Sequence, residues 1–173
     1  GGWDDRTAAP QGELEQRQAL IENHFRAVQY GICQCAAHKK YELGMAAMTL
    51  AAREMIKPGD KVPDDLIGQA IKEVVMHEVG HTLGLRHNFR ASTVYPLAKL
   101  ADPAWTREHG IAGSVMDYPP VNIAVNGEAQ GAYFEPTIGP YDYWAIEYAY
   151  RPLPRQTEND ALAQIAARGA SDP

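Results

Sequence analysis

Three histidines and one glutamate lie within eleven consecutive residues of this sequence, at spacings that suit a metal ion. His77 and His81 are four positions apart, so on a helix both imidazoles project from one face and can reach the same ion. Glu78 directly follows the first histidine, where its carboxylate can reach a water on the metal without binding the metal itself. Gly84 can end the helix in a left-handed conformation, which allows His87 to swing back as a third ligand.

This set of residues predicts a catalytic zinc site. Three neutral imidazoles leave the fourth tetrahedral position to water, whereas a structural zinc is usually closed by four protein ligands. We expect one Zn²⁺ per chain, with the three histidines as ligands and Glu78 as general base. Chance histidines at a helix end are a poor alternative, because five specified residues stand at fixed spacing.

The string HEVGHTLGLRH resembles the extended zinc signature HExxHxxGxxH of the metzincin clan of metallopeptidases. That clan also has a methionine turn downstream, for which residues 114–118 (SVMDY) are the candidate, with Met116 as an apolar floor beneath the ligands. The longer strings HTLGLRHNF and GPYDYWAIEYAY are similar to the bacterial Met-zincin family. The resemblance covers roughly residues 64–150 and implies a zinc-dependent metalloendopeptidase that acts on peptides or proteins.

The resemblance also implies roles for individual residues. A zinc-activated water attacks the peptide bond, while Glu78 takes its proton and later delivers it to the leaving amine. Tyr118 matches the tyrosine that in astacin-like and serralysin-like metzincins ligates zinc at rest and then stabilises the oxyanion. A tyrosine that merely packs beside prolines is the alternative for Tyr118. By the same resemblance, a secreted or periplasmic location is expected.

Two other functions stay open. A zinc-binding scaffold or interaction module would use the site only for folding, although such a site has no need of Glu78. A zinc hydrolase of small amides would use the same ligands. Hydrolysis of a generic protein separates a peptidase from the scaffold, and a comparison of peptides with small amides separates it from the amide hydrolase.

Composition limits the class of protein and its partners. A chain of 173 residues with 45% hydrophobic and 22% charged residues is typical of one globular domain. The net charge of -6 argues against nucleic acid as a partner, and no apolar run is long enough to span a membrane. The chain starts without an initiator Met, so we expect a piece of a longer protein whose other domains are further partners.

We expect a mainly α fold, consisting of a single metzincin-like catalytic domain over residues 1–173. Residues 1–12 predict an arm, residues 13–87 a helical part that ends in a long active-site helix, and residues 88–173 a C-terminal subdomain around the methionine turn. Metzincins usually place a twisted sheet before the zinc helix, and its edge strand pairs with the substrate backbone. That sheet is expected to be upstream of Gly1 or missing, so the isolated chain should bind zinc but cleave proteins poorly.

Apolar residues at spacings of three and four predict helices over 13–36, 43–56 and 64–85, with a break near Gly44. The zinc helix is expected to start with Asp64 as its N-cap. Its buried face is expected to consist of Leu66, Ile67, Ala70, Ile71, Val74, Val75 and Val79. The core is expected to include three methionines of the preceding helix, Met45, Met48 and Met55.

After the motif, residues 88–96 predict a loop, and Asp102 with Pro103 predicts the start of a short helix. Two more helices are expected over 139–150, with Asp142 in its first turn, and over 157–168. The remaining histidines are expected to lie outside the metal site. His24 and His38 have no partner at ligand spacing. His109 is expected to be solvated or to cap the end of its helix, because the motif already provides three ligands.

Overall fold

The computed structural model describes residues 35–57 and 59–169, together with five isolated helical positions: Gly12, Glu15, Gln16, Ala19 and Glu22. The chain divides into two units, residues 1–34 and 35–173, and the candidate site belongs to the second. The arm expected over 1–12 and most of the helix expected over 13–36 lie outside the described residues.

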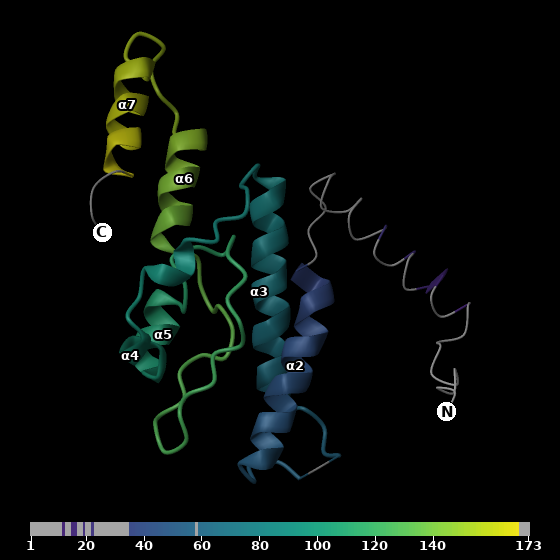
Figure 1. The fold of residues 1–173 in the computed structure, drawn as a ribbon. Coiled ribbons are helices and arrows are strands. Elements are labelled where there is room, and N and C mark those ends of the chain that lie inside the picture. Colours follow the sequence, from purple (N-terminus) through teal and green to yellow (C-terminus); the bar gives the residue numbers. More distant parts are fainter. Residues whose placement is uncertain are drawn as a thin grey trace, which may run out of the picture. The chain divides into compact units, whose positions relative to one another are not determined.

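The second unit consists of helices joined by loops, and its described residues contain no strand (Figure 1). The expected mainly α fold is therefore confirmed. No helix among the described residues has the length and hydropathy needed to cross a bilayer. In chain order the elements are α2 (Cys35–Ala52), α3 (Asp64–Thr82), the short 3-10 helix η1 (Ala91–Thr93), α4 (Leu97–Leu100), α5 (Pro103–His109), α6 (Pro140–Tyr150) and α7 (Glu158–Arg168).

Helices α2 and α3 pack side by side and enclose the main core (Figure 1). The core consists of Ala46 and Leu50 from α2, Leu66 and Ala70 from α3, and Phe134 from the loop before α6. The break expected near Gly44 is wrong, because α2 is continuous through this residue. A single glycine inside a helix costs only about 1 kcal/mol, which packing of the neighbouring residues against α3 can offset.

The methionines of α2 and its end do not fill the core, so this expectation is also wrong. Met45, Met48 and Met55 are 57%, 68% and 59% exposed, while the smaller Ala46 is buried. The face of α2 that meets α3 carries Ala46 and Leu50, which are one helical turn apart. The methionines lie on other faces of the helix or beyond its end.

The buried face of α3 agrees with the expected one at Leu66 and Ala70, which are each 1% exposed, but differs from it further along the helix. Ile71, Val75 and Val79 are 59%, 53% and 49% exposed, whereas Glu73 and His77 on the opposite side are buried. These two polar residues are tolerated inside because each has a partner from another element. Lys39 of α2 forms a 2.9 Å ion pair with Glu73, and a backbone carbonyl accepts a hydrogen bond from His77.

The ends of the helices follow local rules at most positions. The first residue of α3 is Asp64 and its N-cap is Pro63, so the expected N-cap at Asp64 is wrong by one position. The Asp102 carboxylate caps α5, with Pro103 at the first helical position, as expected. The predicted helices over 139–150 and 157–168 correspond to α6 and α7. Helix α4 and the turn η1, which starts at Ala91, were not predicted.

Candidate metal centre

The metal-binding motif spans the end of α3 and the turn that follows it. Gly84 has φ 80°, the left-handed conformation expected at this position. The Leu85 N–H donates to the Gly80 carbonyl and the Gly84 N–H donates to the His81 carbonyl, both at 3.0 Å. This pair of bonds is the Schellman motif, in which a left-handed residue ends a helix and reverses the chain. The reversal returns His87 toward the helix.

The structure brings together the three histidines that the sequence predicts as ligands. One ring nitrogen from each of His77, His81 and His87 lies within 4.8 Å of the other two. The Nε2 atoms of His81 and His87 are 3.1 Å apart. A tetrahedral zinc with Zn–N bonds of about 2 Å holds its ligand nitrogens roughly 3.3 Å apart, so this spacing suits one ion.

Backbone carbonyls determine which nitrogen of two imidazoles is free to bind. The Nδ1 of His77 donates to the Val115 carbonyl at 2.7 Å, and the Nδ1 of His81 donates to the Leu85 carbonyl at 3.0 Å. A carbonyl only accepts, so Nδ1 carries the proton and Nε2 carries a lone pair in both rings. The Nε2 of His77 is buried with no hydrogen-bond partner among the described residues. A bound metal ion would satisfy it.

Burial favours the neutral form of His77 and of His87. It is the main cause that lowers the pKa of His77, with His81 and His87 adding to the effect and the Val115 carbonyl opposing it. The pKa of His87 is lowered by burial and by His81. Only a neutral imidazole binds a metal, so the environment favours the ligand form.

Glu78 and Tyr118 border the three histidines. Glu78 follows His77 directly on α3 and is exposed, and its charge acts to raise the pKa of His77 and His87. The Tyr118 hydroxyl lies 2.8 Å from the Nε2 of His87, the nitrogen that also faces His81. Its ring centroid is 5.0 Å from that of His77.

Met116 packs against α3 between the first two histidines. It is fully buried, and a Cβ added to Gly80 would overlap its Sδ atom. The Met116 carbonyl accepts a 2.9 Å hydrogen bond from the Asn88 N–H, which follows the third histidine. Gly80 is therefore a site residue that sequence reasoning missed. Its small size matters only because Met116, 36 positions later, comes to lie against it.

A buried carboxylate of α6 holds the segment that positions His77. Asp142 accepts hydrogen bonds from the Ser114 hydroxyl at 2.6 Å and from the Val115 N–H at 2.9 Å. It also accepts a 2.8 Å bond from Gly139 at the start of its own helix. The sequence predicts only that Asp142 stands in the first turn of this helix. The two bonds to residues 114 and 115 join α6 to the backbone carbonyl that orients His77.

A second buried carboxylate holds the start of the same segment. Glu135 accepts hydrogen bonds from the N–H groups of Ile111 and Ala112, at 2.9 and 2.8 Å. A Cβ at Gly110 would overlap this carboxylate. Burial raises the pKa of Glu135 to about 8, although these backbone N–H groups act in the opposite direction. Residues 111–117, all buried, are thus held by acidic residues at two points.

Two rings outside the predicted set lie close to Tyr118. Phe89 is 66% exposed, and its ring centroid is 5.7 Å from those of both Tyr118 and His87. The centroid of His38, on α2, is 6.4 Å from that of Tyr118. His38 does not belong to the ligand cluster, in agreement with the sequence, although it was not expected so near. His109 stands at the end of α5, also outside the cluster.

Comparison with curated proteins and with solved structures gave no match to this chain. Comparison with protein families matched residues 59–173 to the Met-zincin family. The match covers well over half of the 173 residues and includes the three histidines, Glu78, Met116 and Tyr118. The sequence resemblance is therefore confirmed, and the chain belongs to the Met-zincin family.

Proposed function

We propose that this protein is a zinc-dependent metalloendopeptidase. The observation that supports it most directly is the Nε2 atom of His77, which is buried without a partner close to the ring nitrogens of His81 and His87. A buried imidazole nitrogen with a free lone pair is unfavourable unless something binds it. Three neutral imidazoles match zinc better than they match calcium or magnesium, which prefer oxygen ligands.

In this proposal the three histidines hold the metal and Val115 and Leu85 orient two of them. Bound zinc would supply Lewis acidity, which polarises the scissile carbonyl and acidifies a water molecule. Glu78 takes a proton from the attacking water as the water oxygen bonds to the carbonyl carbon. The same carboxyl group then gives this proton to the amine nitrogen as the carbon–nitrogen bond breaks.

Tyr118 is proposed to stabilise the negative charge that develops on the substrate. Its hydroxyl lies at the metal-facing nitrogen of His87, so a substrate carbonyl bound there would be within reach of an O–H donor. A hydrogen bond aimed at the developing oxyanion strengthens in the transition state and so lowers the barrier.

Replacement of Glu78 by Gln tests this function. The variant should keep zinc, because Gln changes proton transfer and not the ligands, and it should lose at least about a hundredfold in hydrolysis. The assay is cleavage of an unfolded protein, with zinc content measured by elemental analysis on the same sample. His87→Ala is the comparison variant and should lose zinc.

Three outcomes would contradict the proposal. Activity within a few-fold of the wild type would remove Glu78 from the mechanism. Zinc binding without hydrolysis of any protein or peptide would identify a zinc scaffold. Hydrolysis limited to small amides would identify a different hydrolase.

A further inference from the structure

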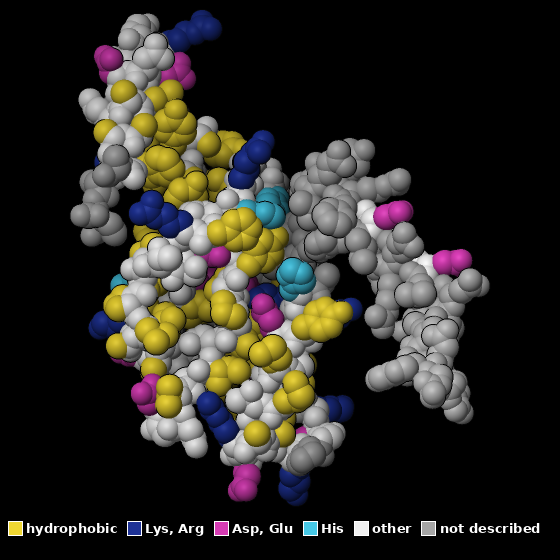
Figure 2. All heavy atoms as spheres, viewed as in Figure 1, with side chains coloured by type: hydrophobic (Ala, Val, Ile, Leu, Met, Phe, Trp, Pro, Cys, Tyr) yellow, Lys and Arg dark blue, Asp and Glu magenta, His cyan; other side chains and the backbone are white. Residues whose placement is uncertain are grey.

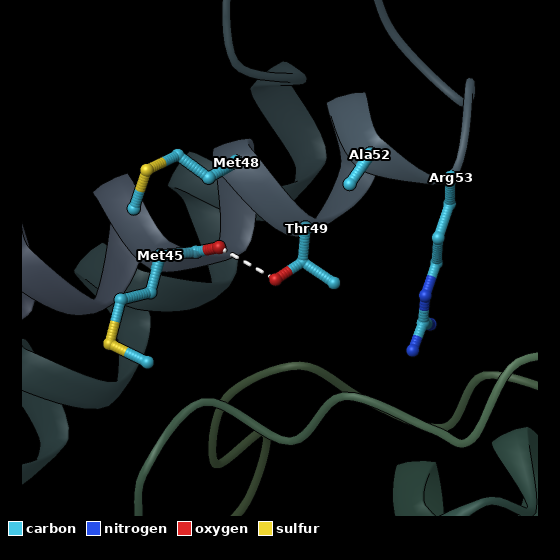
Figure 3. A pocket seen from close by; sticks show the side chains of 5 residues that line it. All are labelled: Met45, Met48, Thr49, Ala52 and Arg53. Carbon is cyan, nitrogen blue, oxygen red and sulfur yellow. Dashed lines mark hydrogen bonds between the residues drawn. The ribbon is translucent and has the colours of Figure 1, made fainter.

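One face of α2 exposes more large apolar side chains than a solvated helix needs. Tyr41, Met45 and Met48 are 65%, 57% and 68% exposed and stand at spacings of four and three, so they share one side of the helix. We call these three residues the methionine face. A hollow of about 370 Å³ continues it toward the end of α2, lined by Met45, Met48, Thr49, Ala52 and Arg53. Figure 3 shows Met45, Thr49 and Arg53 extending from the same side of α2.

The methionine face begins beside the metal centre. His38 precedes Tyr41 by one helical turn, and its ring lies near the ring of Tyr118, whose hydroxyl contacts His87. In Figure 2, histidine side chains adjoin hydrophobic ones, and hydrophobic side chains continue over α2. An apolar surface that starts at a candidate active site is suited to hold the part of a substrate that extends beyond the scissile bond.

A segment of the chain without regular structure runs beside α2 from His38 to Arg53. Residues 118–125 contain no helix or turn. Tyr118 is near His38 at one end, and at the other the Arg53 guanidinium donates a 2.7 Å hydrogen bond to the Ala124 carbonyl. Fifteen helical residues rise about 22 Å, and six extended residues cover about 20 Å. The helix and the segment thus both run from the metal centre toward the hollow.

We propose that the methionine face binds an extended, apolar segment of the substrate. This inference rests on the proposed peptidase function and names its substrate class as unfolded or flexible chains with hydrophobic side chains. The backbone groups of α2 are used within the helix, so recognition comes from side chains and not from strand pairing. Methionine side chains adapt to many apolar shapes, so the preference is for hydrophobic character and not for one sequence.

The length of α2 also indicates how far from the scissile bond the preferred hydrophobic side chains should lie. From His38 to Met45 the helix rises about 10 Å, and to Met48 about 15 Å. An extended peptide covers these distances in roughly three and five residues. Hydrophobic side chains three to five residues from the scissile bond, on one side of it, should therefore strengthen binding.

The test is peptide binding to zinc-loaded protein that carries Glu78→Gln, so that turnover does not interfere. The probes are two fluorescein-labelled sixteen-residue peptides of the same length and charge, one with Leu at every second position and one with Ser instead. Binding is measured by fluorescence anisotropy. We expect the Leu peptide to bind more tightly and the double variant Met45→Gln/Met48→Gln to weaken its binding about tenfold, because two apolar contacts are lost.

A matched control is available on α3. Ile71 and Val75 are 59% and 53% exposed, similar to the two methionines, but lie on the side of α3 opposite the buried Glu73 and His77. Ile71→Gln/Val75→Gln should leave binding of the Leu peptide unchanged. Zinc content and helical circular dichroism verify that each variant is folded.

Each outcome supports or overturns the inference without depending on catalysis. Equal binding of the two peptides, no binding of either, or an unchanged affinity in the methionine variant would overturn it. If the wild type instead sediments as a dimer that the methionine substitutions dissociate, the face is a contact between copies of the chain and the inference is wrong. If the methionine variant binds weakly as expected but the wild type hydrolyses no protein, only the proposed peptidase function fails.

Discussion

His77 depends on Asp142 through the backbone of Val115. Its ring is oriented by the Val115 carbonyl, and the Val115 N–H is held in turn by the Asp142 carboxylate. Asp142 is only 3% exposed, so no water replaces its hydrogen bonds easily. Groups that orient a metal ligand in this way commonly affect metal affinity nearly as much as the ligand does.

Asp142→Ala should therefore weaken zinc binding by roughly ten- to a hundredfold, while Asp142→Asn, which keeps one acceptor oxygen, should weaken it less. Competition with a chromophoric chelator measures both affinities. Asp160→Ala provides the control, because Asp160 is also an acidic residue in a helix first turn but is exposed on α7. Equal affinities for Asp142→Ala and the wild type would show that Val115 needs no support from α6.

The sequence predicted those site residues that lie close together along the chain. His77, His81, Gly84 and His87 lie on one helix end and its turn, so helix geometry alone relates them. The supporting groups were not predictable in the same way. Asp142 is 27 positions from Val115 along the chain, and only the packing of α6 against residues 111–117 brings them together.

The packing of α3 against Met116 gives a prediction for the helix itself. Gly80→Ala adds a methyl group where the sulfur of the fully buried Met116 already lies. We expect a loss of about 1–3 kcal/mol in the free energy of unfolding, measured in urea. The same change in a Met116→Ala background should cost much less, because the methyl group then enters the space that the sulfur leaves.

Gly68 is the control on the same helix, since nothing lies within 4 Å of the position that its Cβ would take. Gly68→Ala should raise the unfolding free energy by roughly 0.4–1 kcal/mol, the usual gain of alanine over glycine in a helix. A stabilising effect of Gly80→Ala similar to that of Gly68→Ala would refute the tight contact with Met116.

The segment 111–117 should make stability depend on pH through Glu135. The pKa of this carboxyl is about 8 in the folded protein and near 4.5 when unfolded, so the folded state binds the proton more tightly. Its contribution to stability is full below about pH 4.5 and is lost as the pH rises toward 8. Each pKa unit corresponds to about 1.4 kcal/mol, so up to about 4 kcal/mol should be lost between pH 5 and 8.

Glu135→Gln, which has no titratable group, should remove this part of the pH dependence. Urea unfolding of the metal-free protein at several pH values compares the two profiles. The lowered pKa values of His77 and His87 act with the opposite sign, since they add stability as the pH rises toward 6.5, the ordinary value for histidine. Both histidines are present in the wild type and in the variant. The difference between the two pH profiles therefore reports on Glu135. Parallel profiles would show that Glu135 does not carry the proton.

For the whole molecule, the sequence predicted which segments are helical better than which faces are buried. The apolar period of three and four residues fits α3, yet Ile71 and Val75 are exposed while Glu73 is inside. The periodicity of apolar residues indicates that a helix has an apolar side. Which side is buried depends on the element that packs against the helix. Lys39 of α2 makes this possible, because its ion pair with Glu73 allows a charged residue in the interior.

Removal of the metal should lower the stability of the whole second unit. A ligand that binds only the folded state stabilises it by about 2.7 kcal/mol at a hundred times its dissociation constant. A strong chelator should therefore lower the melting temperature by several degrees, and added Zn²⁺ but not Mg²⁺ should restore it. Calorimetry with and without chelator measures the shift. A melting temperature that zinc leaves unchanged would indicate that the three histidines hold no ion.

The three ligands lie close together in the sequence, so they can bind an ion early in folding. All three histidines lie on one short stretch, whereas the carbonyl that orients His77 is 38 residues away. An unfolded chain can close a ten-residue loop in about 10–100 ns, so it can capture the ion before α6 and the segment 111–117 assemble. Such an early complex has no fixed choice between Nδ1 and Nε2 at His77 and should release its ion readily. Docking of Val115 then makes that choice and sets how long the ion stays.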